Sequence, residues 1–313
     1  MEPSPTRAAP AVPPWLPAGA ALAAAGWGAN QFTPLAAVYR TQEQWHPVLV
    51  AVLFTAYLPG LLPGLLLGGP AADRFGRRRV VRAALPCLVH AALALLVLAA
   101  TGRAPETTGG TAGAPLRLGG WCRRTVGHPR FVWVVLPASP AVFGAATVAY
   151  VVLPPLVADE VPGYAPLFSG VVAALTLSVG VVAQPLAVRL HHARTARATL
   201  VGMVTVIGGL LVGALAAYGD SVALVLVAAV LLGAGYGLTL GSGLLEIARL
   251  APPSALPSTA FLHQGAAYSG FLTPLLLAVT AGAAPYPALL TGMAVVGLLC
   301  LWVTARFSRG NPP

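Results

Sequence analysis

Between two long apolar stretches the chain reads Gly69-Pro70-Ala71-Ala72-Asp73-Arg74-Phe75-Gly76-Arg77-Arg78. Gly76 permits a tight turn, and Asp73 supplies a negative acceptor that can lie against a helix N-terminus or an arginine. The stretch can be a specific turn motif built on these residues. It can also be a generic basic loop that obeys the positive-inside rule, because arginines clustered beside apolar helices are typical of cytoplasmic loops. In both interpretations, the stretch is a loop between two membrane helices.

Composition excludes a soluble domain. Of the 313 residues 57% are hydrophobic and only 8% are charged, whereas a soluble domain carries roughly 25% charged residues. The net charge of +10 does not indicate nucleic acid, because long stretches hold no charge and the arginines gather in loops. The chain has no lysine, which excludes a Walker-type ATP site. Its three widely spaced cysteines indicate neither a metal site nor a disulfide framework.

Apolar runs long enough to cross a bilayer predict about nine membrane helices. Residues 1–15, rich in Pro and Ala, are expected to form a disordered tail, and residues 16–101 hold three helices. The first is expected to be retained, although its alanine-rich core could be taken for a signal peptide. Residues 102–130 read as a linker rich in Gly, Thr and Arg, residues 131–307 hold six helices, and residues 308–313 are a tail. The predicted helices cover about 16–38, 47–72, 80–101, 131–157, 165–190, 198–218, 220–245, 257–282 and 285–307.

The loop motif resembles the signature that the major facilitator superfamily carries between its second and third helices. The match covers Gly69, Asp73, Arg74, Gly76, Arg77 and Arg78. The resemblance implies an all-α membrane bundle that works by alternating access, with Asp73 and Arg77 in a cytoplasmic gate latch. The equivalent stretch of the second half, Gln184 to Arg194, would be a degraded copy without the Asp or the Gly.

The chain departs from that family plan of two six-helix halves, because its first half has only three helices. We interpret it as an internally deleted transporter that lacks the fourth to sixth helices. Arginines flank alternate loops of the second half and predict that both of its ends face the cytoplasm. With the N-terminus in the cytoplasm, the three helices of the first half would leave the chain outside the cytoplasm where the second half begins. The linker must then cross, one helix must fail to span, or the second half must insert against its charge bias.

Glycines at every fourth position predict two packing seams, Gly60/Gly64/Gly68 and Gly233/Gly237/Gly241. Such seams let helix backbones approach closely in a membrane. A substrate-lining role for them is the less favoured alternative.

Polar side chains inside apolar runs are candidates for the substrate cavity. They are Asn30, Gln31, His90, Gln184, Tyr236, His263, Gln264 and Tyr268. Asn30 and Gln31 suit substrate contact and an interhelical hydrogen bond about equally. His90 and His263 can titrate near neutral pH, although a packing histidine is the more favoured interpretation. Glu246 is expected to pair with Arg249 rather than to carry a proton.

These observations favour a monomeric secondary transporter in a bacterial cytoplasmic membrane. It would move a small molecule, and resemblance to efflux members implies proton-coupled export. We expect membrane lipid around it, no nucleic-acid partner, no cofactor, no metal and no enzymatic activity. A non-transporting remnant is the main alternative, because half of one cavity wall would be missing. A membrane enzyme is disfavoured, because the His191-His192 pair has no carboxylate support.

Overall fold

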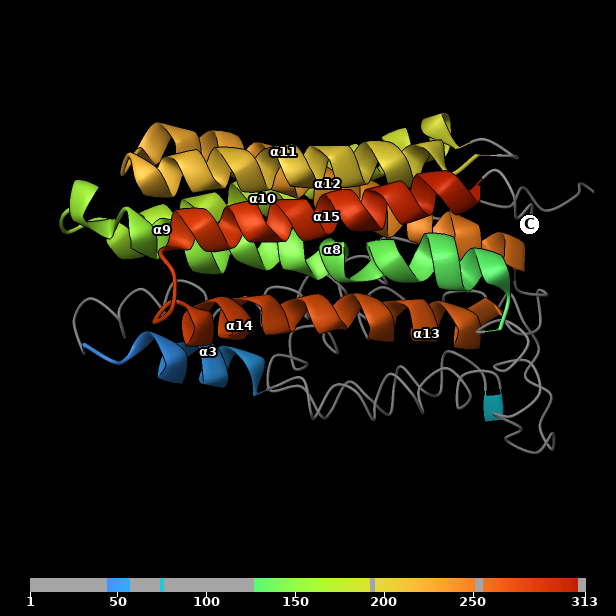
Figure 1. Ribbon diagram of the computed structural model, residues 1–313, viewed down its shortest axis with the longest axis horizontal. Coiled ribbons are helices and arrows are strands. Elements are labelled where there is room, and N and C mark those ends of the chain that lie inside the picture. Colours follow the sequence, from blue (N-terminus) through green and yellow to red (C-terminus); the bar gives the residue numbers. More distant parts are fainter. Residues whose placement is uncertain (1–43, 57–73, 76–126, 192–194, 251–255, 309–313) are drawn as a thin grey trace, which may run out of the picture.

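The computed structural model describes residues 44–56, 74–75, 127–191, 195–250 and 256–308. These residues form a bundle of helices that run roughly parallel to one long axis (Figure 1). The helices are α3 (Pro47–Thr55), α8 (Leu136–Thr147), α9 (Leu153–Leu156), α10 (Ala165–Leu190), α11 (Arg197–Tyr218), α12 (Val222–Leu250), α13 (Leu256–Tyr268), α14 (Thr273–Thr280) and α15 (Tyr286–Ser308). The predicted helices at 16–38 and 80–101, and most of the one at 47–72, lie outside the described residues.

Five helices of 22 to 29 residues in the described part are long and apolar enough to cross a membrane. Four of them are α10, α11, α12 and α15. The fifth runs from Phe131 to Leu156: the π-helical turn Phe131–Val135 leads into α8, and a second one, Val148–Val152, joins α8 to α9. The bounds agree with the predicted helices to within about five residues, as expected for ends read from sequence alone. This part of the chain is therefore a multi-pass membrane bundle by length and composition.

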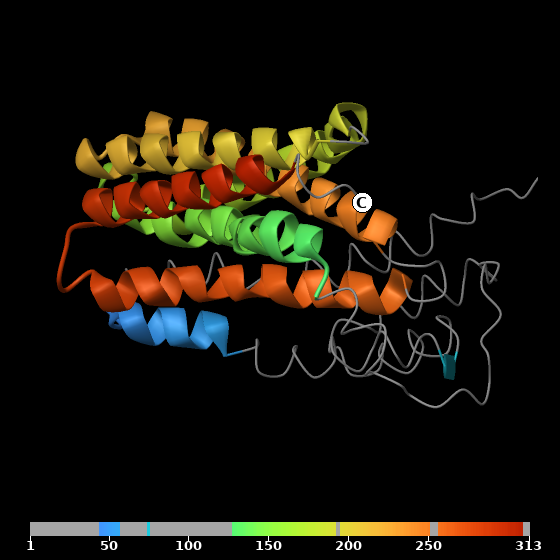
Figure 2. The same cartoon turned by 45° about the vertical axis from the view of Figure 1, so that its right-hand side comes forward.

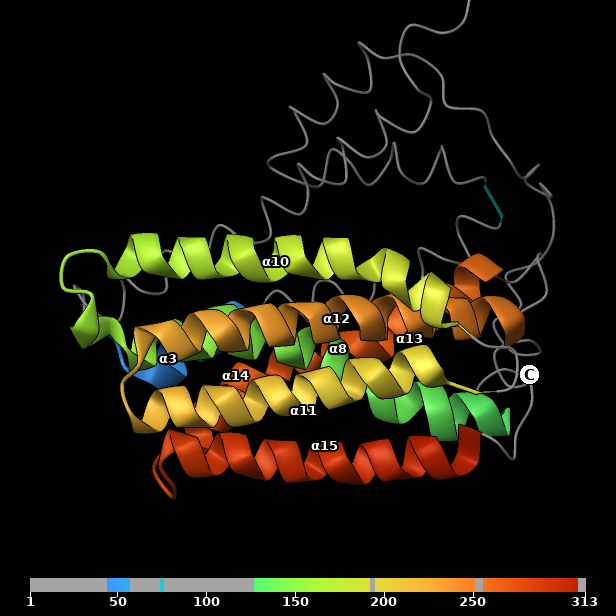
Figure 3. The same ribbon diagram turned by 90° about the horizontal axis from the view of Figure 1, so that it is seen from above.

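The outer faces of the bundle remain apolar, which suits a lipid environment. Helices α10 and α15 lie on opposite sides of α12 and α11 (Figure 3). On α10 Val182 is 78% exposed, and on α15 Trp302 is 65% exposed. A water-soluble protein rarely exposes such continuous apolar faces, so lipid tails are their natural solvent.

Helix α12 packs on α10 through the predicted glycine seam. The backbones at Gly233 and Gly237 contact those at Thr176 and Gly180, and a Cβ placed on Gly241 would lie 3.1 Å from the side chain of Ala187. The seam at Gly233, Gly237 and Gly241 is thus a packing surface, as predicted. The other predicted seam, Gly60/Gly64/Gly68, lies outside the described residues.

A second set of close contacts joins α12 to α11 and has no four-residue repeat on one helix. A Cβ on Gly202 would lie 2.9 Å from the side chain of Thr239, and one on Gly209 would lie 2.7 Å from that of Leu232. Both glycines belong to α11, and α12 adds a third close contact, because a Cβ on Gly235 would lie 2.5 Å from the side chain of Val206. Helix α12 therefore packs closely against α10 on one side and against α11 on the other, and it lies between them in the bundle (Figure 3).

The predicted helix at 257–282 is interrupted. Helix α13 ends at Tyr268, a 3₁₀ turn follows at Ser269–Leu272, and α14 resumes at Thr273. Pro274 has no N–H to donate to the carbonyl of Gly270 four residues earlier. Within the 3₁₀ turn that carbonyl instead accepts from the backbone N–H of Thr273, and the hydroxyl of Thr147 on α8 lies 3.4 Å from it. Figure 2 shows α13 and α14 following one another beside α3.

Successive long helices alternate in direction, so the opposite charges gather at opposite ends of the bundle (Figures 1 and 3). One end carries the helix-terminal arginines Arg130, Arg189, Arg197, Arg249 and Arg306. The connections at the other end carry Asp159, Glu160 and Asp220. Both ends of the unit 127–308 thus lie on the arginine side, as the charge pattern predicts.

This arrangement predicts which residues face the cytoplasm. In a chain whose three native cysteines are replaced, Arg197→Cys should react with a membrane-impermeant maleimide only after the cells are permeabilised, because arginine-rich ends stay inside. Asp220→Cys and Asp159→Cys should react in intact cells. All three positions are exposed. Labelling of Arg197→Cys in intact cells would contradict the orientation.

Candidate functional site

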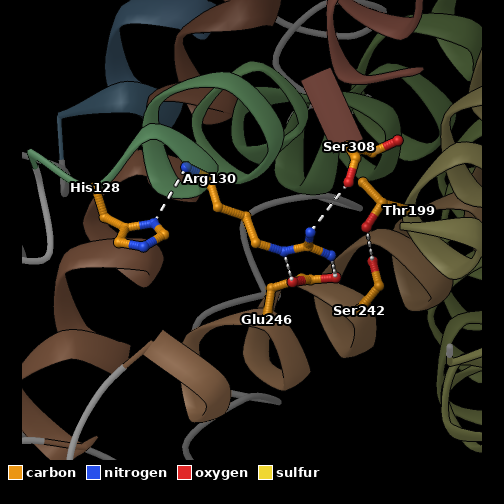
Figure 4. Close-up of polar contacts among 6 residues, drawn as sticks. All are labelled: His128, Arg130, Thr199, Ser242, Glu246 and Ser308. Atoms are coloured by element: carbon orange, nitrogen blue, oxygen red, sulfur yellow. Dashed lines mark hydrogen bonds and ion pairs between the residues drawn. The ribbon is translucent and has the colours of Figure 1, made fainter. Parts of the chain in front are cut away.

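A buried ion pair holds together the arginine-rich end of the bundle. Arg130 Nε lies 2.6 Å from Glu246 Oε2, and Arg130 Nη2 donates to Glu246 Oε1 at 3.0 Å. The two residues are 0% and 2% exposed. A forked guanidinium-carboxylate contact of this kind is stronger and more directional than a single hydrogen bond. Figure 4 shows the ends of the two side chains pointing toward each other.

The guanidinium joins three helices. Arg130 caps the first long helix, Glu246 lies near the end of α12, and Arg130 Nη1 donates to the carbonyl of Ser308, the last residue of α15, at 3.2 Å. A helix C-terminus carries partial negative charge, so this carbonyl is a suitable third acceptor for the cation. We call Arg130, Glu246 and Ser308 the Arg130 cluster. It fixes the ends of three chain segments that are remote in sequence.

The structure differs from the sequence-based predictions for Glu246 and for Arg130. The sequence predicted Arg249 as the partner of Glu246, and this is wrong, because the carboxylate is bound by Arg130. The sequence places Arg130 at the end of the linker 102–130, yet its side chain is fully buried. The physical reason is the same for both. A glutamate at the end of a helix can be buried only if its charge is matched inside the protein.

Smaller polar contacts surround the Arg130 cluster. The backbone N–H of Arg130 donates to His128 Nδ1 at 3.2 Å, and the hydroxyl of Thr199 on α11 donates to that of Ser242 on α12 at 3.1 Å (Figure 4). Beyond the end of α10, burial and then the positive charge of Arg249 lower the pKa of His191 below its usual 6.5. His191 is therefore neutral at pH 7 and adds no charge to this end.

His263 lies deep between helices and is only 1% exposed. Its Nδ1 lies 3.2 Å from the hydroxyl of Ser139 on α8. Its ring rests on Gly243 of α12, where a Cβ would overlap Nε2 and Cε1. Nε2 itself is buried and has no hydrogen-bond partner. The structure thus makes His263 a residue in the contact among α8, α12 and α13.

Aromatic rings from three helices meet in the interior. Phe143 of α8 stacks on Tyr268 of α13 with ring centroids 4.7 Å apart and planes 3° apart, and it stacks on Phe271 at 4.6 Å. Tyr236 of α12 lies 5.8 Å from Phe143 in a tilted arrangement. We call Phe143, Tyr236, Tyr268 and Phe271 the aromatic cluster. Phe54 of α3 adjoins it, 5.9 Å from Phe271.

The aromatic cluster is partly open. Phe143, Tyr236 and Tyr268 are each half-buried, whereas Tyr150, which also lies on the first long helix, is 3% exposed. Part of each of these three side chains therefore remains accessible. Aromatic faces attract flat apolar groups and organic cations, and the hydroxyls add hydrogen-bonding capacity.

The structure brings together some of the predicted cavity residues. Tyr236 and Tyr268 share the aromatic cluster, and His263 lies five positions before Tyr268 on the same helix. Gln184 is half-buried on α10 with its backbone beside Gly241, and Gln264 is half-buried on α13. Asn30, Gln31 and His90 lie outside the described residues.

Most of the loop motif also lies outside the described residues. This applies to Gly69, Asp73, Gly76, Arg77 and Arg78. Arg74 is described, and its guanidinium lies 5.2 Å from the ring centroid of Phe75. The gate-latch role of the motif therefore stays a prediction.

Sequence reasoning missed Phe143, Phe271, Ser139 and Arg130. Phenylalanine and serine are ordinary residues in a membrane helix, so no local signal distinguishes Phe143 or Ser139 from their neighbours. For Arg130 a signal did exist. It directly precedes an apolar run, and a second run is followed by Glu246, whose burial needs a cation.

Across the described ranges, no three His, Cys, Asp or Glu side chains are grouped so as to hold a metal ion. Fold and site together define a multi-pass helical membrane protein with an aromatic interior. Comparison with protein-family models, curated proteins and solved structures finds no match to the chain.

Proposed function

We propose that the chain is a secondary transporter for a small organic molecule, built on a plan like that of the major facilitator superfamily. The observation that carries this is the aromatic cluster, in which Phe143, Tyr236 and Tyr268 from three helices are half-buried inside the bundle. Small-molecule sites between helices are commonly lined by aromatic side chains with a few polar groups. The proposed substrate is flat and apolar or cationic, because stacked ring faces favour such groups.

The remaining parts of the proposal come from the sequence. They are nine membrane helices in a three-plus-six arrangement, a monomer in a bacterial cytoplasmic membrane, and proton-coupled export. The loop motif from Gly69 to Arg78 supports the family plan. The common arginine-rich end of residues 127–308 supports an even number of crossings in the second half.

Transport should depend on the rings of the aromatic cluster. In proteoliposomes with an imposed pH gradient, movement of a fluorescent planar cation such as ethidium is expected to fall about tenfold in Tyr236→Ala and in Tyr268→Ala, since an aromatic contact contributes ~1 kcal/mol or more. Tyr236→Phe should keep most of the stacking and separates the role of the ring from that of the hydroxyl. Tyr218→Ala is the matched control, because Tyr218 is 81% exposed at the end of α11.

The same measurement tests the main alternative, a folded remnant that moves nothing. A remnant would give equal, background fluxes for the unmodified chain and all variants. Equal losses in Tyr218→Ala and Tyr236→Ala would instead show that the aromatic cluster is not the binding surface.

A further inference from the structure

We propose that Nε2 of His263 is a proton-binding site, and that its occupation separates α13 from α12 and so moves Tyr268 within the aromatic cluster. The inference rests on the proposed function in one respect: a proton-driven cycle needs a group inside the bundle that gains and loses a proton. The protonation and the movement can nevertheless be measured without transport.

The hydrogen bonds assign the tautomer of His263. The hydroxyl of Ser139 donates its single hydrogen to the carbonyl of Val135 at 2.8 Å. Its oxygen can then only accept from His263, whose Nδ1 lies 3.2 Å away. Nδ1 therefore carries the ring hydrogen, and Nε2 presents an unshared electron pair. Because Nε2 is buried without a hydrogen-bond partner, its electron pair is free to bind a proton.

The surroundings of Nε2 accommodate a neutral ring and not a cation. The ring lies against the backbone of Gly243, whose missing side chain makes room for it. The nearest anion along α12 is Glu246, one turn further on, and both of its carboxylate oxygens are bound by Arg130. Among the residues that the structure describes, none would serve as a free counterion for a second positive charge beside this satisfied pair. Such a charge is costly in a membrane protein and favours rearrangement.

Every titratable or charged group on the described elements around His263 can be named. Helix α12 carries Tyr236, Glu246 and Arg249, and α13 itself adds Tyr268. Arg130 caps the first long helix, and Tyr150 lies further along it. Glu246 is the one carboxylate among them, and it is already bound by Arg130. A protonated His263 must therefore compete for Glu246 or move toward water.

The break after α13 gives this movement a direction. The 3₁₀ turn at Ser269–Leu272 is fixed by Gly270, whose backbone contacts that of Pro140 and Gly144 on α8. Helix α13 can pivot at this point while α14 stays in place. Tyr268 is the last residue of α13 and stacks on Phe143. A swing of α13 away from Gly243 would therefore change the stacking of the aromatic cluster.

Two physical measurements test the proton site directly. In chain labelled with ¹⁵N-histidine, His263 should show the Nδ1–H tautomer at pH 8 and gain a proton at Nε2 on acidification. Spin labels at Leu244 on α12 and Leu262 on α13 should report a longer distance in the protonated state. His263→Asn keeps a side-chain N–H that can donate to Ser139 but has no second nitrogen, so the distance should no longer depend on pH. His191→Asn is the matched control and should behave like the unmodified chain.

An Nε2–H tautomer at pH 8, a ring that stays neutral down to pH 4, or the same pH-dependent distance in His263→Asn would overturn the proposal. If His263→Asn does not fold, Ser139→Ala provides a second test. Loss of the acceptor should shift the tautomer at pH 8 toward Nε2–H, and an unchanged tautomer would contradict the assigned hydrogen bond.

Transport assays keep this inference distinct from the proposed function. His263→Asn should reduce proton-driven accumulation of ethidium about tenfold or more while leaving exchange of ethidium without a pH gradient within roughly twofold. Equal loss in both modes would overturn the coupling role. Absence of transport in every chain, with the expected tautomer and distance change, would instead remove the proposed function and leave the proton site in place.

Discussion

Replacing Glu246 by Gln is expected to lower the free energy of unfolding by about 3–5 kcal/mol, which is typical when one partner of a buried ion pair is removed. The reason is that Arg130, with no exposed surface, would keep its charge while losing the carboxylate that it holds at 2.6 Å and 3.0 Å. Unfolding in detergent, followed by circular dichroism against denaturant, measures the change. The end of α15 should loosen first, because Ser308 is bound through the same guanidinium.

Glu160→Gln is the matched control for this variant. Glu160 is exposed at the opposite end of the bundle, so its neutralisation should change stability by no more than about 0.5 kcal/mol. A combined Arg130→Met and Glu246→Met chain removes both charges and should recover much of the loss. Equal effects of Glu246→Gln and Glu160→Gln would show that the ion pair contributes nothing specific.

Adding a single methyl group at Gly237 should destabilise the bundle by about 1–3 kcal/mol, the usual cost of overpacking a close contact. The backbones at Gly237 and Gly180 already touch, so the new Cβ of Gly237→Ala would force α12 away from α10. Small residues at such interfaces allow the close approach that holds membrane helices together. Thermal unfolding in the same detergent measures the loss.

Gly208→Ala provides the comparison at another helical glycine. A Cβ at Gly208 meets no atom within 4 Å, so the substitution should be neutral or stabilise the helix by up to about 1 kcal/mol. If Gly237→Ala were as stable as Gly208→Ala, the α10–α12 seam would not be the close contact described above.

The ends of helices show where reasoning from sequence stopped short. The sequence predicted that the helix at 220–245 ends before Glu246, whereas α12 continues to Leu250. A charged residue marks the end of an apolar run in sequence, yet it can lie inside a helix once its charge is matched. The match comes from Arg130, which is 116 positions earlier in the chain. No local pattern contains that information.

The bend between α13 and α14 was only partly predictable. Pro274 indicated a kink within the apolar run, because proline leaves the carbonyl of Gly270 without its helical donor. The sequence did not reveal that the break would be a 3₁₀ turn locked against Gly144 of α8. That contact depends on how two helices cross, which follows from the shapes of many side chains together.

By itself the sequence determined the membrane class of this protein, the approximate bounds of the helices in its second half, the glycine seam on α12 and the charge asymmetry between the two ends. These features follow from hydropathy, spacing and charge, which act locally and persist in any bilayer. Only the tertiary structure decided that Arg130 binds Glu246, that Ser139 sets the tautomer of His263, and that Phe143 joins Tyr236 to Tyr268. Hydrogen bonds and ring stacking need atoms within a few ångströms, and residues 93 to 125 positions apart reach that distance only when the helices pack.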